Sequence, residues 1–282
     1  MRRLASSGST NALFRLGDEL LVRLPRQPGG SASISKEVTW LPVLGPLLPV
    51  AVPEVVAVFE PDHAYPERWS VVRWIEGAHP EVVDPDTSVD PRREVLADDL
   101  ATVLDALRQA EVGEGALHNR HLQSYRGAPL ATMDQGTREN IERCRSLDDF
   151  GFDLDAAEQI WAEAMKLPGA ADPTTPRWYH GDLAAENLLV RDGALAAVLD
   201  FGGLSVGDPT VDLVVAWEVL DPPARELFRR RVGVDDATWL RGRAWALSIS
   251  LMIWYYWTTM PERRASRMAV GRNILADAGY SV

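Results

Sequence analysis

Three oxygen-bearing side chains in the second half of the chain could together carry out phosphoryl transfer. Asp182 stands in a His-Gly-Asp segment, Asn187 follows five residues later, and Asp200 begins an Asp-Phe-Gly segment. Phosphoryl transfer needs a carboxylate that orients the attacking hydroxyl and accepts its proton, and oxygen ligands that hold magnesium on the phosphates. Asp182 suits the first role, and the other two residues suit the second. Any one of them alone is better explained as a turn, cap or strand-end residue, so the prediction depends on all three.

A β-hairpin is expected to bring the two metal-ligand candidates together. Apolar runs at 187–190 and 195–199 flank an Asp-Gly pair, which is typical of a tight hairpin turn. A turn centred on that pair would place Asn187 opposite Val198 and leave Asp200 two residues further on. Diagonal neighbours in a hairpin lie roughly 7 Å apart, and each magnesium–oxygen bond is about 2.1 Å. Two side chains can reach one ion from these positions.

This segment resembles the aminoglycoside phosphotransferase family, a branch of the kinase-like superfamily that has His-Gly-Asp where protein kinases have His-Arg-Asp. The resemblance implies that Asp182 is the catalytic base and that Asn187 and Asp200 bind Mg²⁺. It extends to a Gly-Asp-Pro segment at 207–209, and it implies that Asp212 is a buried anchor for the catalytic loop. The alternative for Asp212 is an ordinary aspartate at a helix start.

The elements around these residues divide into a β-rich beginning and a helical remainder. Short apolar runs typical of strands occupy 12–16, 19–24, 55–59 and 69–74, and helical spacing of apolar residues begins after residue 78. The family resemblance implies an α+β, bilobal protein-kinase-like fold with a small, mainly antiparallel β lobe and a larger, mainly helical lobe. We expect residues 1–75 to form the nucleotide-binding lobe and residues 76–282 the catalytic and acceptor-binding lobe.

The nucleotide, ATP or GTP, is expected between the lobes. Alternation along the second strand puts Leu21 and Arg23 on one face. In kinase-like folds these positions hold an apolar residue against the base and a lysine on the phosphates. A guanidinium is not equivalent to an ammonium, which leaves the choice of nucleotide open; a solvated strand arginine is the alternative. The further candidate contacts are the loop residues Gly8, Ser9 and Thr10, the backbone of Arg73, Trp74 and Ile75, and Glu37 as partner of the arginine.

Glu37 lies in a helix that we expect from Ser33, as its cap, to about Leu44, where prolines at 42, 46, 49 and 53 would break it. A glutamate that only complements the helix dipole is an equal interpretation. Further helices are expected near 90–107, 137–147, 211–220, 222–231, 236–260 and 262–278. His180 is expected to be a structural hydrogen-bonding residue.

Composition excludes several classes of protein. The net charge is −12, and the first 75 residues contain eight basic and seven acidic residues, so the excess negative charge lies beyond them. A nucleic-acid partner is therefore disfavoured. The most apolar stretch, 245–257, is shorter than the roughly 20 residues of a membrane span, and no signal peptide is evident. We expect a cytoplasmic location without a membrane partner, and a core position for Cys144, the single cysteine.

The acceptor is expected to be a small molecule with a hydroxyl group. A run of carboxylates before the catalytic loop favours a cationic, aminoglycoside-like antibiotic, although each residue alone is better explained as a solvated or capping side chain: Asp148, Asp149, Asp153, Asp155, Glu158 and Glu163. Aromatic residues crowded into 239–257 are mostly core, but one or two would suit a macrolide.

Four alternatives stay open at this point. A macrolide or peptide-antibiotic phosphotransferase, or a kinase for an amino alcohol or sugar, would use the same centre. A protein kinase is disfavoured because Asp200 to Asp208 leaves no room for an activation segment. A non-catalytic nucleotide-binding module is conceivable because Arg23 replaces the usual lysine.

Overall fold

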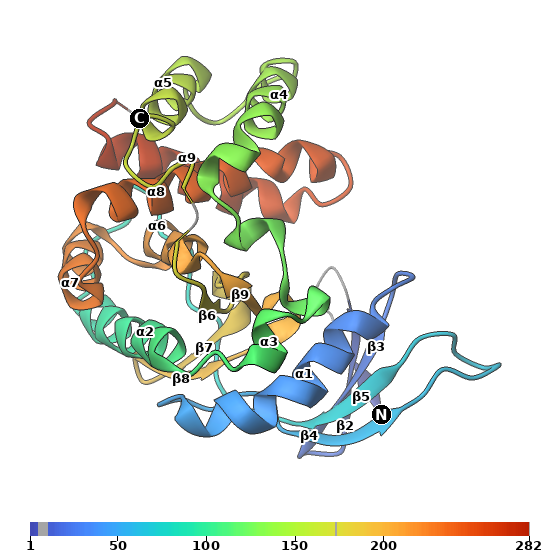
Figure 1. Cartoon of the computed structure of the whole chain (residues 1–282). Coiled ribbons are helices and arrows are strands. Elements are labelled where there is room, and N and C mark those ends of the chain that lie inside the picture. The colour runs from blue at the N-terminus through green and yellow to red at the C-terminus, as the bar shows by residue number, and fades with distance from the viewer. Residues whose placement is uncertain (5–10, 173, 282) are drawn as a thin grey trace.

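An antiparallel five-stranded sheet forms the first part of the chain (Figure 1). The structure is a computed structural model, and it describes residues 1–4, 11–172 and 174–281. The strand order is β1-β2-β3-β5-β4. The strands are Arg2–Arg3, Asn11–Leu16, Leu20–Pro25, Val55–Phe59 and Trp69–Arg73, numbered β1 to β5 along the chain. The sheet of the expected β-rich beginning is confirmed, and β1 is a strand that the apolar pattern did not predict.

The hairpin of β2 and β3 positions two of the predicted nucleotide contacts. Its register pairs Leu16 with Leu20 across a turn in which Gly17 has a positive φ of 61°. Side chains alternate across a strand, so Leu21 and Arg23 share one face of the sheet. Arg23 is buried rather than solvated, at 5% exposure.

Helix α1, Ser31–Leu44, begins two residues before the expected cap at Ser33. The carboxylate of Glu67, from the β4–β5 connection, accepts hydrogen bonds from Gly29 N, at 2.9 Å, and Ser31 N, at 2.9 Å. A carboxylate at a helix N-terminus satisfies free N–H groups and complements the helix dipole. The expected end near Leu44 is confirmed: Pro42 lies inside the last turn of the helix, where Leu44 is buried.

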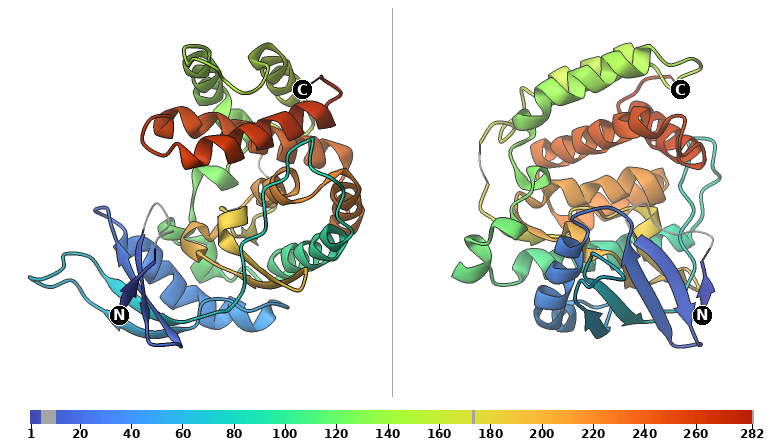
Figure 2. Two further views of the ribbon diagram at one scale, coloured as in Figure 1. Left: turned by 180° about the vertical axis from the view of Figure 1, so that it is seen from behind. Right: turned by 90° about the vertical axis from the view of Figure 1, so that its right-hand side faces the viewer.

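The second part of the chain is a bundle of helices with two short two-stranded sheets (Figure 2). Its helices run Arg92–Gln109, Glu114–Leu117, Asp134–Arg145, Leu154–Ala164, Val215–Val219, Pro222–Val232, Asp236–Leu251 and Glu262–Asp277, numbered α2 to α9. Helices α4 and α5 lie at the end farthest from the sheet in both figures. The core between the helices includes Leu100, Leu104, Trp161, Trp217 and Trp245.

Two expectations about these helices need correction. The helix predicted for 236–260 ends at Leu251 and continues as a 3-10 turn, Met252–Tyr256, because consecutive aromatic residues there cannot all face the core. The segment 211–220 is not one α-helix: it begins in the 3-10 turn Pro209–Val214 and continues as the short α6. In the described part of the chain, no helix combines the length and apolarity that crossing a membrane would take.

Two short two-stranded sheets flank the segments with candidate catalytic residues. Strand β6, Arg177–Tyr179, pairs with β9, Ser205–Gly207, and β7, Leu188–Arg191, pairs with β8, Ala194–Val198. The expected pairing of Asn187 with Val198 was wrong: a bulge at Leu189/Val190 shifts the register, so Leu188 lies opposite Val198. Asn187 instead ends a 3-10 turn, and its carbonyl accepts a 2.8 Å hydrogen bond from Leu199 N.

Cys144 is predicted to be inert in the folded protein. Its side chain is fully buried in α4, and burial raises the pKa of the thiol to about 12. The thiolate is the reactive form, so a thiol reagent at pH 8 should label the native chain at least about 100-fold more slowly than the chain unfolded in denaturant, where the pKa is about 8.5. Labelling followed by mass spectrometry measures both rates; equal rates would contradict the buried position.

Candidate active site

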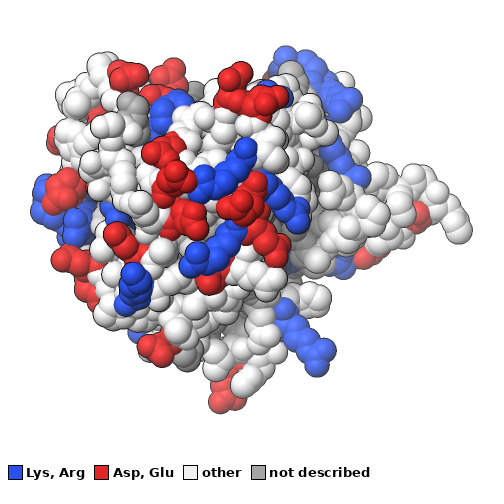
Figure 3. Space-filling view, turned by 90° about the horizontal axis from the view of Figure 1, so that it is seen from above, with Lys and Arg blue, Asp and Glu red and all other residues white. Residues whose placement is uncertain are grey.

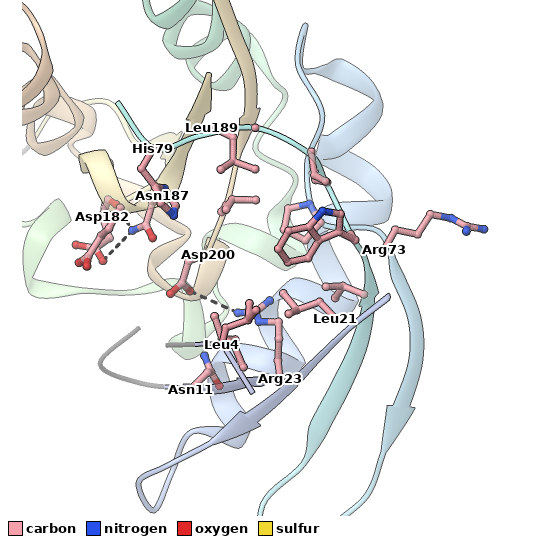
Figure 4. Close-up of a pocket in the computed structure, with 18 residues that line it drawn as sticks. Leu4, Asn11, Leu21, Arg23, Arg73, His79, Asp182, Asn187, Leu189 and Asp200 are labelled. Atoms are coloured by element: carbon pink, nitrogen blue, oxygen red, sulfur yellow. Dashed lines mark hydrogen bonds and ion pairs between the residues drawn. The ribbon is translucent and has the colours of Figure 1, made fainter. Parts of the chain in front are cut away.

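A cavity of about 340 Å³ lies between the five-stranded sheet and the segments that carry Asp182, Asn187 and Asp200 (Figure 4). Eight of the predicted site residues line it: Leu21, Arg23, Arg73, Trp74, Ile75, Asp182, Asn187 and Asp200. Glu37 lies behind Arg23 and contacts it. The predicted loop residues Gly8, Ser9 and Thr10 fall outside the described residues. The cavity therefore collects residues that are up to about 180 positions apart in the sequence.

Asp212 holds the segment 180–187, which carries Asp182 and Asn187 and is called the catalytic loop. Its two carboxylate oxygens accept hydrogen bonds from His180 N, at 2.6 Å, and Gly181 N, at 2.8 Å. The carboxylate is buried, and burial raises its pKa, although the two backbone hydrogen bonds oppose the shift. The buried anchor implied by the family resemblance is present in the structure, in preference to the helix-start alternative.

Replacing this anchor is predicted to destabilise the fold. Asp212→Ala would leave two buried N–H groups without an acceptor, each at a cost of about 1–3 kcal/mol. We expect the free energy of unfolding, measured by urea denaturation, to fall by about 2–5 kcal/mol. Asp236→Ala, which removes an exposed carboxylate paired with Arg229, is the control and should change it by less than about 0.5 kcal/mol. A loss as small as the control's would show that the anchor is not needed.

His180 holds the loop through its ring. Its Nδ1 lies 3.2 Å from the donating Asp182 N, and its Nε2 lies 2.9 Å from Leu199 O. An acceptor at Nδ1 and a carbonyl at Nε2 fit the neutral tautomer with its proton on Nε2. Gly181 between them has a φ of +82°, and an added Cβ would lie 2.5 Å from Gly203 O. His180 thus has the structural contacts expected of it, and only glycine fits at 181.

The Asp182 carboxylate has a different partner at each oxygen. Oδ1 lies 2.6 Å from an Arg126 guanidinium nitrogen, and Oδ2 accepts a 3.3 Å hydrogen bond from Asn187 Nδ2. Burial acts to raise the pKa of Asp182, but the adjacent Arg126 guanidinium outweighs it and lowers the pKa below its ordinary value. The side chain, 44% exposed, is an ionised carboxylate at the cavity wall.

Asn187 and Asp200 offer oxygen atoms to the same cavity (Figure 4). The Asn187 amide nitrogen donates to the Asp182 carbonyl at 2.8 Å, which leaves the amide oxygen for a ligand. Among the described residues no group of three or more His, Cys, Asp or Glu could hold a metal. Mg²⁺ is commonly bound by one or two protein oxygens completed by phosphates and water, so these residues fit Mg²⁺ with a nucleotide.

The backbone at Asp200 is constrained. Its φ of 54° and ψ of 68° lie in the left-handed region, which aspartate tolerates better than most residues. The turn is held by a 3.3 Å bond from Gly202 N to the Asp200 carboxylate and by Phe201, which is fully buried and packs edge-on against His180. The side chain of Asp200 is thereby aimed at the cavity.

Arg23 links the sheet to the metal-ligand candidates. Its guanidinium pairs with the fully buried Glu37 and lies 3.7 Å from Asp200 Oδ1. Burial opposes the charge on Arg23, but Glu37 and Asp200 outweigh it and raise its pKa. The expected Arg23–Glu37 pair is confirmed, and Glu37 does more than complement a helix dipole.

The strand end after β5 forms the other wall of the cavity. The Arg73 side chain points away from the cavity (Figure 4) and pairs with Glu54 at 2.9 Å. The amides of Arg73 and Trp74 donate to Glu54 O and Glu19 O, at 2.9 and 2.7 Å. Among the described residues, Ile75 therefore remains as the residue of this segment whose backbone N–H is available to a base.

Among the residues that sequence reasoning missed are two basic ones that contact the loops carrying Asp182 and Asp200. Arg126 comes from the 3-10 turn Tyr125–Gly127 and contacts Asp182. Lys36 comes from α1, and its ammonium donates to Gly202 O at 2.9 Å. Neither belongs to a recognisable motif, although Lys36 directly precedes Glu37. Arg126 had no sequence signal, because its contact spans 56 positions.

Three of the six carboxylates proposed to attract a cation form an ion pair or cap a helix. Arg145 pairs with Asp155 and Glu158 at 2.6 and 2.9 Å, and Asp153 caps α5. Seen from above, acidic and basic side chains interleave over the helices (Figure 3). Beside the catalytic loop, Glu186 pairs with Arg263 at 2.6 Å. The face seen in Figure 3 therefore has no large patch of a single charge sign among the described residues.

A five-stranded sheet, a helical part and a catalytic loop facing a shared cavity define a kinase-like phosphotransferase fold. The chain belongs to the phosphotransferase enzyme family, whose sequence profile matches residues 2–245. It is 30% identical over 152 residues to an aminoglycoside 3'-phosphotransferase of Escherichia coli, and the match covers 51% of this chain and 51% of that protein.

Solved structures show the same fold. The GDP and kanamycin complex of APH(2")-IIia superposes with a TM-score of 0.68 at 20% identity, covering 97% of this chain and 91% of that one. The apoenzyme of the macrolide 2'-phosphotransferase MphH from Brachybacterium faecium superposes with a TM-score of 0.61 at 22% identity, covering 97% and 91%. At these identities the likeness concerns the fold and leaves the acceptor to be argued from the site.

Proposed function

We propose that the protein transfers the γ-phosphoryl group of ATP or GTP to a hydroxyl of a small molecule, most simply an aminoglycoside-like antibiotic. The observation that carries the proposal is the shared cavity, which holds Asp182, Asn187 and Asp200 on one side and Arg23 on the other. Residues 1–75 would bind the nucleotide, and residues 76–282 would supply the catalytic and acceptor-binding groups.

Each cavity residue has a role that its chemistry supports. Asp182, ionised and exposed to the cavity, would orient the acceptor hydroxyl and take its proton. Arg23, held by Glu37, would bind phosphate oxygens with its planar fork. Leu21 would contact the base, and the Ile75 amide would donate to its edge. The predicted phosphate contacts of Gly8, Ser9 and Thr10 stay a prediction.

Asn187 and Asp200 would hold Mg²⁺ through the amide oxygen and the carboxylate. When bound, the ion supplies positive charge that neutralises the developing charge on the phosphates. The aspartate's left-handed backbone and its bond from Gly202 N keep the carboxylate in place before a nucleotide arrives. The site is therefore arranged in advance, which lowers the cost of ordering it during the reaction.

The acceptor class has two candidates. The family relative from Escherichia coli is named for aminoglycosides, and a polyamine-like acceptor would be attracted by a negatively charged chain. The pairing of Asp155 and Glu158 with Arg145 reduces the free negative charge at the proposed acceptor wall. This observation favours, as second candidate, a less cationic acceptor such as a macrolide.

Purified protein incubated with ATP or GTP, Mg²⁺ and single acceptors tests the proposal. The acceptors are kanamycin, gentamicin, a macrolide, a tuberactinomycin-type peptide, choline and glucose. We expect nucleotide consumption that needs both Mg²⁺ and one antibiotic, and a product heavier by one phosphoryl group. Consumption with choline or glucose alone would indicate a metabolite kinase. Nucleotide binding without turnover across the panel would indicate a binding module and contradict the proposal.

A further inference from the structure

The turn that carries Arg126 is built into the fold next to the catalytic loop. Gly127 O accepts a 2.9 Å hydrogen bond from Asp208 N, and an added Cβ at Gly207 would lie 2.6 Å from that carbonyl. Ser124 caps the turn by accepting from Arg126 N, at 3.3 Å. The guanidinium is thus delivered from a backbone that packs against β9.

Arg126 touches the catalytic loop at two atoms with one nitrogen. Its Nη1 donates to Gly181 O and to Asp182 Oδ1. Its Nε donates to the Tyr125 hydroxyl at 3.2 Å. The arginine side chain is 21% exposed. A charge-assisted bond from a partly buried guanidinium is among the stronger hydrogen bonds in proteins, so Oδ1 is the firmly held oxygen of the carboxylate.

The other oxygen, Oδ2, is held less firmly and lies on the side of Asn187. Its 3.3 Å bond from Asn187 Nδ2 is long for a hydrogen bond. Asp182 and Asn187 line the cavity, whereas Arg126 is not among the described residues that line it. The carboxylate is therefore gripped from outside the cavity, and the oxygen beside Asn187 has a free lone pair for a substrate.

We propose that Arg126 is a positioning residue of phosphoryl transfer, which holds Oδ1 of Asp182 so that Oδ2 receives the acceptor's proton. The inference rests on the proposed function. In the step, the acceptor oxygen bonds to the γ-phosphorus as the bond from that phosphorus to the bridging oxygen breaks. The electron pair leaves with the nucleoside diphosphate, and the hydroxyl proton passes to Oδ2.

The test compares Arg126→Met with wild type, using the acceptor that the panel identifies. We expect kcat to fall by about 10–100-fold, part of the 10²–10⁴-fold that a general base contributes, while the KM for nucleotide stays within about 2-fold. Arg126→Lys should keep more activity than Arg126→Met, because a single nitrogen makes both contacts. Arg272→Met is the matched control: Arg272 also donates to one carbonyl and one carboxylate, Gly151 O and Asp84, but not in the catalytic loop.

A double-mutant cycle separates positioning from a merely structural role. If Arg126 acts through Asp182, adding Arg126→Met to Asp182→Ala should lower the residual rate by less than about 2-fold. Multiplicative losses, an unchanged kcat in Arg126→Met, or an equal kcat loss in Arg272→Met would overturn the inference. If wild type phosphorylates no acceptor, the proposed function fails, and the same cycle run on nucleotide hydrolysis, with water as acceptor, still decides whether Arg126 acts through Asp182.

Discussion

Asp182→Ala is expected to lower the rate of phosphoryl transfer by at least about 10²–10⁴-fold, the range that a general base contributes. The physical reason is that Asp182 presents an ionised carboxylate to the cavity. Of the other two carboxylates that line the described cavity, Asp200 is aimed at the proposed metal site and Glu186 is paired with Arg263. The nucleotide dissociation constant should change by less than about 3-fold, because Asp182 is not expected to contact the nucleotide. Single-turnover transfer and calorimetric nucleotide binding measure the two quantities.

Asp182→Asn is the matched variant for this experiment. It keeps the shape of the side chain and an oxygen that can accept from Arg126, but an amide cannot take up the proton. We expect it to be nearly as inactive as Asp182→Ala and closer to wild type in thermal stability. Activity within about 10-fold of wild type in either variant would remove Asp182 from the mechanism.

Arg23→Met is expected to destabilise the protein as well as weaken nucleotide binding. The change leaves Glu37, which is fully buried, without its cationic partner. Removing one member of a buried ion pair typically costs about 3–5 kcal/mol, so the free energy of unfolding should fall by that amount. Denaturant titration measures the loss, and calorimetry measures the nucleotide dissociation constant where the variant is still folded.

The double variant Arg23→Met, Glu37→Leu separates the two effects. Replacing both members of a buried pair by apolar residues is often neutral or stabilising, so stability should return to within about 1 kcal/mol of wild type. Nucleotide affinity should not return, because the phosphate-binding guanidinium is still missing. Recovery of nucleotide affinity in the double variant would show that Arg23 acts only on stability.

Local patterns predicted much of the fold for a physical reason. The β2–β3 hairpin depends on a glycine turn and on alternation over six residues, both of which are written in adjacent positions. The helix expected near 90–107 is present as α2, and its helically spaced Leu96, Leu100 and Leu104 lie in the core, whereas Val95 is exposed. Where local propensity and burial agree, sequence reasoning is sufficient.

The errors occurred where a distant contact overrode the local pattern. Glu67 starts α1 earlier than the expected Ser33 cap, from 36 positions away. The β7–β8 bulge moves the register by one residue, and no residue type in that hairpin signals it. Distant contacts also reduce the predicted base contacts at 73–75 to the amide of Ile75, because the amides of Arg73 and Trp74 already donate to neighbouring backbone carbonyls.

The sequence by itself predicted the chemistry of the site, which is one base, two oxygen ligands and a phosphate-binding cation, because side-chain type and close spacing express such a pattern directly. The tertiary structure decided which atoms are free to act. Arg126 contacts Oδ1 of Asp182, and Arg145 pairs with two of the carboxylates that favoured a cationic acceptor. Arg126 and Asp182 are 56 positions apart in the sequence. Contacts of this kind arise from the packing of whole elements, which local propensity does not encode.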